Sequence, residues 1–298
     1  MTEVRSHSAR DFPLPMLREA KGEHTISVCI PARNEEATVG TIVGAIHEHL
    51  ASNGHSLVDE ILVIDDRSED GTAAVARAAG AVVVEVADVL PGMAPGAGKG
   101  NVLWKSVAAC RGDLIVWIDA DLTSFTPACV TGLVGPLLTD PDIAMVKGYY
   151  ERPEIGGTGG GRTTELMARP LLATLFPHLT SVRQPLGGEY AARRDILEQV
   201  PFSMGYGVET GLLIDIAALV GTERLAQVDL GVRVHRNRPL HELSVQAMEI
   251  LHVALHRAEV EWQDEWSHVL LRPDLEPVEA LVDERPPLAT VDEYLRTR

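Results

Sequence analysis

An apolar run that ends on two carboxylates, residues 114–122 (LIVWIDADL), constrains this chain more than any other stretch. The run has the composition of a buried strand. Side chains in an extended chain alternate between faces, so Asp119 and Asp121 point to the same side. Two oxygen ligands at that spacing suit a divalent cation that carries a diphosphate. An isolated Asp-x-Asp is more often a strand followed by a polar turn, so the rest of the chain must decide.

The first 122 residues alternate between strand and helix patterns. Strands are predicted at 25–31, 60–64, 81–86 and 114–118, and helices at 37–50, 71–79 and 101–110. This alternation predicts βαβ units, a mostly parallel sheet flanked by helices, and chemistry at the carboxyl ends of the strands. A glycine-rich loop with one lysine, Lys99, precedes the fourth strand, but it does not match the phosphate-binding P-loop pattern.

The second half of the chain continues the pattern less regularly. Helices are predicted at 127–138, after the glycine-rich segment through residue 172, at 212–220 and at 239–262. Strands are predicted at 143–150 and 228–238, and residues 184–191 are predicted to be a loop that leads into a short strand. A glycine-rich segment, 156–161, leads to Arg162 and Thr164 at a helix entrance. That segment is either a flexible linker or an anion site built from backbone N–H groups and a guanidinium.

Five arginines form an unusual concentration in so acidic a chain: Arg193, Arg194, Arg233, Arg236 and Arg238. The predicted strand 228–238 places Arg233 and His235 on one face. A basic surface exposed to solvent is the alternative, but the loops bounded by glycine and proline favour a ligand-binding site. Glu209, near the start of the helix at 212–220, could belong to that site or only complement the helix dipole.

Composition argues against nucleic acid and membranes as partners and indicates the compartment of the protein. The net charge of −17 over 298 residues argues against binding to nucleic acid or an anionic membrane, because both need clustered lysine and arginine. Three sparse cysteines indicate a reducing compartment. No apolar segment resembles a signal peptide or a membrane span. We therefore expect a cytoplasmic protein.

Eight ordered motifs together resemble the actinobacterial glucosyl-3-phosphoglycerate synthases, which are retaining glycosyltransferases of the GT-A fold. The resemblance extends from about residue 24 to about residue 245. The motifs are PARNEE at 31–36, DDRS at 65–68, GKG at 98–100, DAD at 119–121, GGRTTE at 160–165, QPLGGEY at 184–190, GYGVE at 205–209 and HRNRP at 235–239.

The resemblance implies an enzyme that moves a hexose, with glucose favoured, from a nucleotide sugar to the 2-hydroxyl of 3-phosphoglycerate. Mg²⁺ or Mn²⁺ would be held by Asp119, Asp121 and His235, and the acceptor by Gly161, Arg162, Thr164 and Asn237. Catalytic roles fall to Asp121, Glu209 and Arg233. The implied donor-binding residues are Pro31, Ala32, Arg33, Glu35, Asp66, Lys99, Asp119, Leu186, Glu209 and Arg233.

Several alternatives stay open at this stage. The family more often has Ser where this chain has Asp66, so the donor could be a UDP-, GDP- or ADP-sugar, the sugar could be mannose, and another small acid could be the acceptor. A nucleotidyltransferase would need its glycine-rich loop directly after the first strand, where this chain has residues 32–36. A regulatory protein with an inactive site is the non-enzymatic alternative, and the carboxylates speak against it.

We expect four segments. They are an N-terminal arm (1–23), a donor-binding half (24–122), an acceptor-binding half (123–240) and a C-terminal helix and tail (241–298). The resemblance and the long C-terminal helix also suggest a homodimer.

Overall fold

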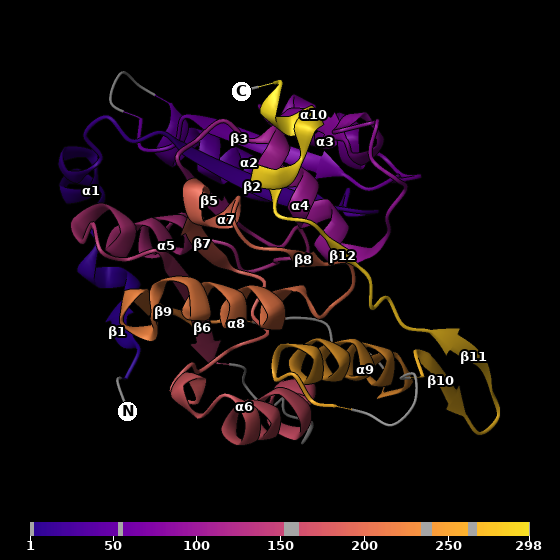
Figure 1. Cartoon of the computed structure of the whole chain (residues 1–298). Coiled ribbons are helices and arrows are strands. Elements are labelled where there is room, and N and C mark those ends of the chain that lie inside the picture. The colour runs from indigo at the N-terminus through magenta and orange to yellow at the C-terminus, as the bar shows by residue number, and fades with distance from the viewer. Residues whose placement is uncertain (1–2, 53–55, 152–160, 234–239, 262–266, 298) are drawn as a thin grey trace.

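An eight-stranded sheet forms the centre of the molecule (Figure 1). The computed structural model describes residues 3–52, 56–151, 161–233, 240–261 and 267–297. The strand order is β1-β9-β6-β7-β5-β2-β3-β4, with bounds β1 Arg5–Ser8, β2 Ile26–Ala32, β3 Glu60–Asp65, β4 Val82–Glu85, β5 Leu114–Trp117, β6 Met145–Glu151, β7 Tyr190–Arg193 and β9 Leu225–Val232. Strand β7 runs antiparallel to both neighbours, β5 and β6, and the other pairings are parallel. The predicted mostly parallel sheet is confirmed.

Helices cover both faces of the sheet and enclose two apolar cores. One core contains residues of α4 (Gly98–Ala109) and α8 (Val208–Val220). The other contains residues of α2 (Val39–Ile46), α3 (Thr72–Ala78) and α5 (Ala128–Thr139). Strand β5 supplies Ile115 and Trp117 to the first core and Leu114 and Val116 to the second, as alternating side chains require. Shorter elements are η2 His47–Ala51, η3 Val86–Asp88, η5 Pro177–Leu179, α7 Arg194–Leu197, β8 Phe202–Ser203 and η6 Thr222–Arg224.

The N-terminal arm belongs to the sheet. Strand β1 pairs with β9 at the sheet edge, and η1 (Ala9–Asp11) and α1 (Leu14–Ala20) follow it. Leu17 of α1 is fully buried. Gly135 in α5 leaves room for the Phe12 ring, because a Cβ there would lie 2.2 Å from that ring. The packing of α1 against α5 therefore anchors this segment.

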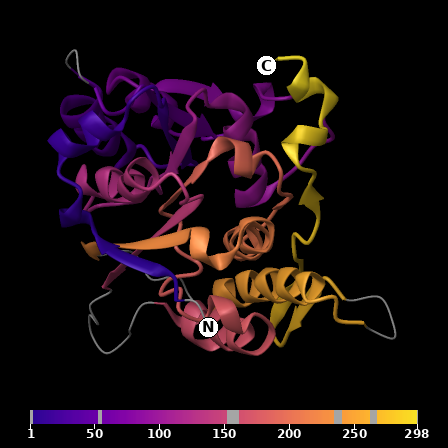
Figure 2. The ribbon, with the colours of Figure 1, turned by 60° about the vertical axis from the view of Figure 1, so that its left-hand side comes forward.

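The C-terminal part begins with the predicted long helix, α9 (Leu240–Arg257), which packs against α8 and against the helical segment 162–175 (η4 Thr164–Ala168 and α6 Arg169–Leu175). A hairpin, β10 (Val269–Arg272) and β11 (Leu275–Glu279), projects beside α9. The chain then returns along the outside of the molecule through β12 (Glu284–Arg285) and η7 (Leu288–Thr290) to α10 (Asp292–Leu295) (Figure 2). We call residues 280–291 the C-terminal strap.

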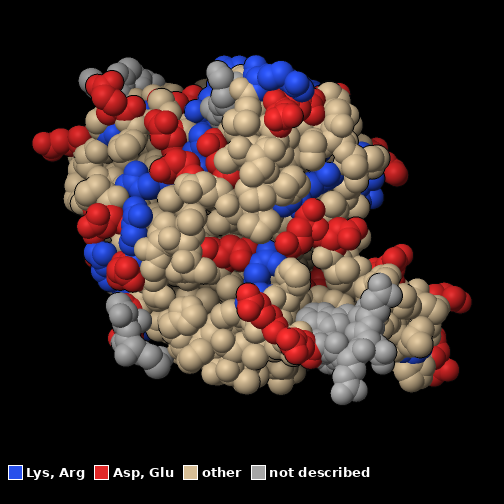
Figure 3. Space-filling view, in the orientation of Figure 1, with Lys and Arg blue, Asp and Glu red and all other residues tan. Residues whose placement is uncertain are grey.

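The charge of the surface and the apolar character of the helices indicate which partners the protein can have. On the face shown in Figure 3, lysines and arginines are interspersed with aspartates and glutamates. An anionic ligand approaching this face therefore meets only local positive charge. Within the described ranges, no helix combines the length and the apolar character needed to cross a bilayer.

Candidate active site

The carboxyl ends of three neighbouring strands meet at one edge of the sheet. Strands β2, β3 and β5 are parallel neighbours, so the polar residues that follow them lie close together. The backbone N–H of Asp66 donates to the carbonyl of Ala32 at 2.9 Å, which joins the ends of β3 and β2. Asp119 and Asp121 follow β5. The edge predicted from the sequence is thus formed.

A pocket of about 370 Å³ opens at this edge. We call it the strand-end pocket. Seven of its lining residues were predicted to bind the donor: Pro31, Ala32, Arg33, Glu35, Asp66, Lys99 and Asp119. The remaining ones are Gly98, Val102, Ala120, Asp121 and Tyr206. The structure therefore brings this predicted set together, and its role in binding stays a prediction.

A second pocket of about 210 Å³ adjoins the first, and we call it the helix-entrance pocket. The predicted acceptor residues Gly161, Arg162 and Thr164 line it, and so do Leu186, Glu209 and Arg233. The backbone of Gly161 is left-handed (φ 84°), and the helical segment 162–175 starts immediately after it. The first backbone N–H groups of that segment have no partners within the helix, which favours an anion there. Asn237, the fourth predicted acceptor residue, lies outside the described residues.

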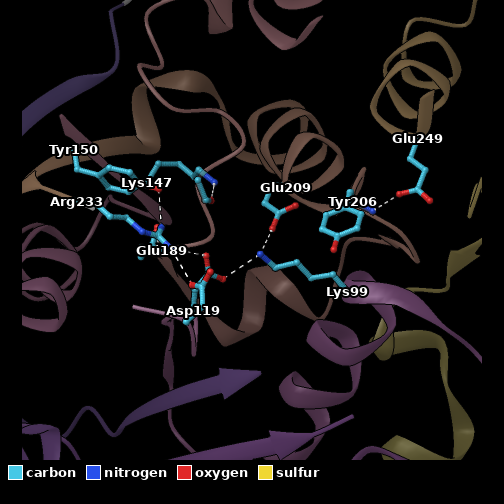
Figure 4. Close-up of polar contacts among 11 residues, drawn as sticks. Lys99, Asp119, Lys147, Tyr150, Glu189, Tyr206, Glu209, Arg233 and Glu249 are labelled. Carbon is cyan, nitrogen blue, oxygen red and sulfur yellow. Dashed lines mark hydrogen bonds and ion pairs between the residues drawn. The ribbon is translucent and has the colours of Figure 1, made fainter. Parts of the chain in front are cut away.

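The two pockets share Lys99, Asp119, Asp121 and Tyr206. Lys99 lies in the first turn of α4, which starts three residues earlier than the predicted helix. Its Nζ lies 3.1 Å from Asp119 Oδ1 and 2.8 Å from Glu209 Oε1 (Figure 4). Glu209 lies in the first turn of α8, as predicted, and is buried. Lys99 therefore joins an acidic group of each pocket.

Arg233 contacts both aspartates at the junction of the two pockets, which is where the four shared residues lie. Its Nη2 donates to Asp121 Oδ1 at 3.1 Å and lies 3.5 Å from Asp119 Oδ2. Its Nη1 donates to the Tyr150 hydroxyl at 2.7 Å and to Glu189 Oε1. One guanidinium thus fixes both carboxylates of the Asp-x-Asp motif, and the planar fork suits that task.

Burial and charge perturb the protonation of this cluster. Burial by itself raises the pKa of Asp119, but the positive charges of Lys99 and Arg233 outweigh it and hold that pKa at about 2. Burial, with the nearby Asp119 charge, raises the pKa of Glu189 to about 7. Burial also lowers the pKa of Lys147 to about 8. Asp119 is therefore a permanent anion near neutral pH.

Two of the three predicted metal ligands can be assessed. The side chains of Asp119 and Asp121 are 25% and 50% exposed, and both face the junction. Hard carboxylate oxygens suit Mg²⁺ and Mn²⁺, so these residues fit the expected cofactor. His235 lies outside the described residues, and within the described ranges no three His, Cys, Asp or Glu side chains gather as a metal site.

The prediction that Arg193 and Arg194 belong to the basic site is wrong. Strand β7 is antiparallel to β5, and Arg193 pairs with Leu114 at the far end of the sheet from Asp119. Arg194 is buried there and donates to three backbone carbonyls, those of Val107, Cys110 and Gly112. Arg193 likewise donates to two backbone carbonyls, those of Leu137 and Ile143, so both arginines have structural roles. Arg236 and Arg238 lie outside the described residues.

Several residues of the junction received no role from the sequence. Tyr206 lines both pockets, and Tyr150 and Glu189 hold Arg233. Part of the wall of the helix-entrance pocket comes from one face of α9, at Leu243, Gln246 and Ile250. Spacing of three and four residues marks a helix face, but it does not say what that face lines.

Comparison with known proteins identifies the family. Residues 27–200 match the model of glycosyl transferase family 2. Glucosyl-3-phosphoglycerate synthase of Petrotoga mobilis is 45% identical over 92% of this chain and 89% of the relative. The synthase of Mycolicibacterium smegmatis is 50% identical over 81% of this chain and 80% of its own.

A solved structure matches the whole fold. Glucosyl-3-phosphoglycerate synthase of Mycobacterium tuberculosis, in complex with Mn²⁺, UDP-glucose and phosphoglyceric acid, matches with a TM-score of 0.87. The sequences are 43% identical, and the match covers 96% of this chain and 98% of that chain. These matches confirm the resemblance drawn from the motifs, including the GT-A fold. The chain belongs to glycosyl transferase family 2 and, within it, to the glucosyl-3-phosphoglycerate synthases.

Proposed function

We propose that the chain transfers glucose from UDP-glucose to the 2-hydroxyl of 3-phosphoglycerate, with retention at the anomeric carbon and with Mg²⁺ or Mn²⁺ as cofactor. The meeting of the two pockets at Lys99, Asp119 and Asp121 carries the proposal, because it gives a donor and an acceptor a common boundary. Relatives from M. tuberculosis were solved with UDP-glucose and phosphoglyceric acid, and with UDP and glucosyl-3-phosphoglycerate.

The strand-end pocket takes the nucleoside in this proposal. Pro31, Ala32, Arg33, Glu35 and Asp66 surround it. Asp66 Oδ1 accepts from Arg67 Nε at 3.0 Å, and Asp66 Oδ2 lies 3.9 Å from Arg33 Nη1. Arg67 therefore fixes Asp66 beside the pocket, and the complex of the M. tuberculosis synthase with UDP-glucose supports UDP as the nucleotide.

The helix-entrance pocket takes the acceptor. Arg162 offers a planar guanidinium that can bind a phosphate or a carboxylate through two hydrogen bonds. Thr164 and the start of the helix beside Gly161 add neutral donors to the same pocket. We assign the fourth contact to Asn237. Residues 24–122 thus form the donor half and 123–240 the acceptor half of one domain.

Asp119 and Asp121, with His235, would hold the divalent cation. When bound, that cation supplies Lewis-acid stabilisation of the negative charge on the departing nucleoside diphosphate. Lys99 and Arg233 place two further positive charges at the same boundary. Leu186 lines the adjoining pocket, where the sugar reaches it.

Glu209 orients the sugar in this proposal and does not attack it. Its buried carboxylate is held 2.8 Å from Lys99 Nζ, which fixes its direction. Attack by the acceptor on the same face that the nucleotide leaves then gives retention without a glycosyl-enzyme. Mass spectrometry after rapid quenching tests this, since a glucosyl adduct on Glu209 would contradict the front-face route.

One experiment tests the function as a whole. UDP-, GDP- and ADP-glucose and a mannose donor are each incubated with 3-phosphoglycerate and Mg²⁺, and release of the nucleoside diphosphate is followed. We expect release with UDP-glucose that depends on both the acceptor and the metal, and an α-linked product by NMR. The matched control replaces 3-phosphoglycerate with glycerate, which lacks the phosphate. Absence of release with every donor would refute the transferase proposal.

We further propose that the chain forms a homodimer through the side that carries α9 and the β10–β11 hairpin. A two-stranded hairpin is marginally stable unless something packs on it. Exposed apolar side chains gather on this part of the chain, at Leu240, Leu271 and Leu275. Sedimentation velocity over a range of protein concentrations measures the mass, and a monomer throughout would contradict the dimer.

A further inference from the structure

Tyr206 stands at the boundary of the two pockets. It lines both of them, together with Lys99, Asp119 and Asp121. Figure 4 shows its ring beside Lys99 and its backbone N–H directed at Glu249. The residues on either side, Gly205 and Gly207, are buried. The position of this short loop, residues 204–207 between β8 and α8, therefore decides where the Tyr206 ring lies between donor and acceptor.

One buried carboxylate holds the loop from the side of α9. Glu249 is 3% exposed; its Oε2 accepts from the N–H of Tyr206 at 2.7 Å, and its Oε1 accepts from the N–H of Leu281 at 2.9 Å. The backbone of Gly205 passes close to it, since a Cβ there would lie 2.4 Å from Oε2. Glu249 thus ties α9 to the Tyr206 loop and to the C-terminal strap.

The other side of the loop docks on α4. The carbonyl of Met204 accepts from the N–H groups of Gly100 at 2.7 Å and Asn101 at 3.3 Å. A Cβ at Gly100 would lie only 1.6 Å from the carbonyl oxygen of Ser203, so the two backbones are in direct contact. The loop is therefore held between the helix turn that carries Lys99 and the helix that forms the wall of the helix-entrance pocket.

We propose that Glu249 is a positioning residue for glycosyl transfer, which holds the Tyr206 loop so that Tyr206 keeps donor and acceptor in register. The inference rests on the proposed function, because the register matters only if both pockets are filled at once. Among the described residues, Glu249 is not part of the lining of either pocket. Its loss should therefore reduce turnover more than it weakens the binding of either substrate.

Glu249→Gln is the informative variant, because it keeps the shape of the side chain. Its single amide oxygen can accept from one of the two N–H groups, and its NH₂ group faces the other. Glu242→Gln, on the exposed face of the same helix, is the matched control. We expect Glu249→Gln to lower kcat about tenfold, with the KM of each substrate within about threefold of wild type, since small misplacements cost large factors in rate. Glu242→Gln should match wild type.

Two further measurements separate positioning from a general structural role. In a Tyr206→Ala background, Glu249→Gln should lose most of its effect on kcat, because coupled residues are not additive. Hydrogen exchange of the peptide covering residues 203–208 should be faster in Glu249→Gln than in Glu242→Gln, and this readout does not depend on turnover.

The outcomes distinguish this inference from the proposed function. Wild-type kcat in Glu249→Gln, a full tenfold loss in the Tyr206→Ala background, or unchanged exchange in the loop would each overturn the role of Glu249. If the wild-type protein releases no nucleotide from any donor, the proposed function fails instead. The exchange measurement then still decides whether Glu249 holds the loop.

Discussion

Gly188 offers a direct test of whether Asp119 lies at the reacting centre. A Cβ at Gly188 would lie 2.4 Å from Asp119 Oδ1 and 2.5 Å from Oδ2. The Gly188 backbone is outside the left-handed region, so alanine introduces no backbone strain. Gly188→Ala therefore acts on the carboxylate and leaves the loop able to keep its conformation.

The size of the effect follows from the contact. Ordinary van der Waals contact begins at 3.4 Å, so the carboxylate must move by about 1 Å. It cannot move freely, because Lys99 and Arg233 hold one oxygen each at 3.1 and 3.5 Å. A displacement of about 1 Å at a reacting centre costs on the order of 100-fold in rate. We expect a loss of that size in kcat and a weaker response to Mg²⁺ or Mn²⁺.

Gly187→Ala is the matched control, one residue away in the same loop. A Cβ at Gly187 would lie 3.3 Å from the carbonyl oxygen of Gly148 and 3.4 Å from that of Gln184, which is close to ordinary contact. The assay is the release of UDP from UDP-glucose with 3-phosphoglycerate over a metal titration, after thermal unfolding has shown both variants to be folded. Wild-type kcat and metal response in Gly188→Ala would refute the placement of Asp119.

Three further predictions follow from the site and the core. Asp121→Ala should abolish metal-dependent turnover while UDP-glucose still protects the protein against thermal unfolding; substantial kcat in this variant would contradict a ligand role. Arg162→Ala should raise the KM for 3-phosphoglycerate by roughly 10- to 100-fold, as expected for a lost charged hydrogen bond, with little change in the KM for UDP-glucose; an unchanged acceptor KM would move the acceptor site elsewhere. Because burial lowers the pKa of Lys147 to about 8, the folded protein binds fewer protons than the unfolded chain above that pH, and its stability should rise there. Relative to Lys147→Met, wild type should gain roughly 3 kcal/mol between about pH 7 and pH 11 in urea unfolding, and a pH-independent difference would contradict a buried, neutralised lysine.

The parallel half of the sheet and its active edge were predictable because their signals are local. Strands β2, β3 and β5 are apolar runs that end on polar residues, and parallel strands must present those residues at one edge. The Asp-x-Asp pair needed only the two-residue period of an extended chain. The family motifs then supplied the expected roles of Arg162 and Glu209, and the structure places both beside that edge.

The sequence alone determined less about the antiparallel strand and the C-terminal part. An apolar run has no direction, so nothing local showed that β7 turns Arg193 and Arg194 away from the site. The C-terminal strap was expected only as part of a helix and tail (241–298), without named contacts. Arg285 in it donates from Nε to Asn101 Oδ1 at 2.9 Å, across a separation of 184 residues. No periodicity records a contact over that distance.

The Asp-x-Asp motif shows what the local sequence determines and what only the tertiary structure determines. Its spacing was enough to predict two carboxylates on one side of a strand end, whereas the divalent cation was predicted only with the support of the other motifs. Only the tertiary structure decided that Lys99 and Arg233 flank the pair, that Gly188 leaves room for it, and that Tyr206, held by Glu249, stands at the boundary of the two pockets. The physical reason is that local sequence governs the direction of a side chain within its own element, whereas its partners depend on how distant elements pack.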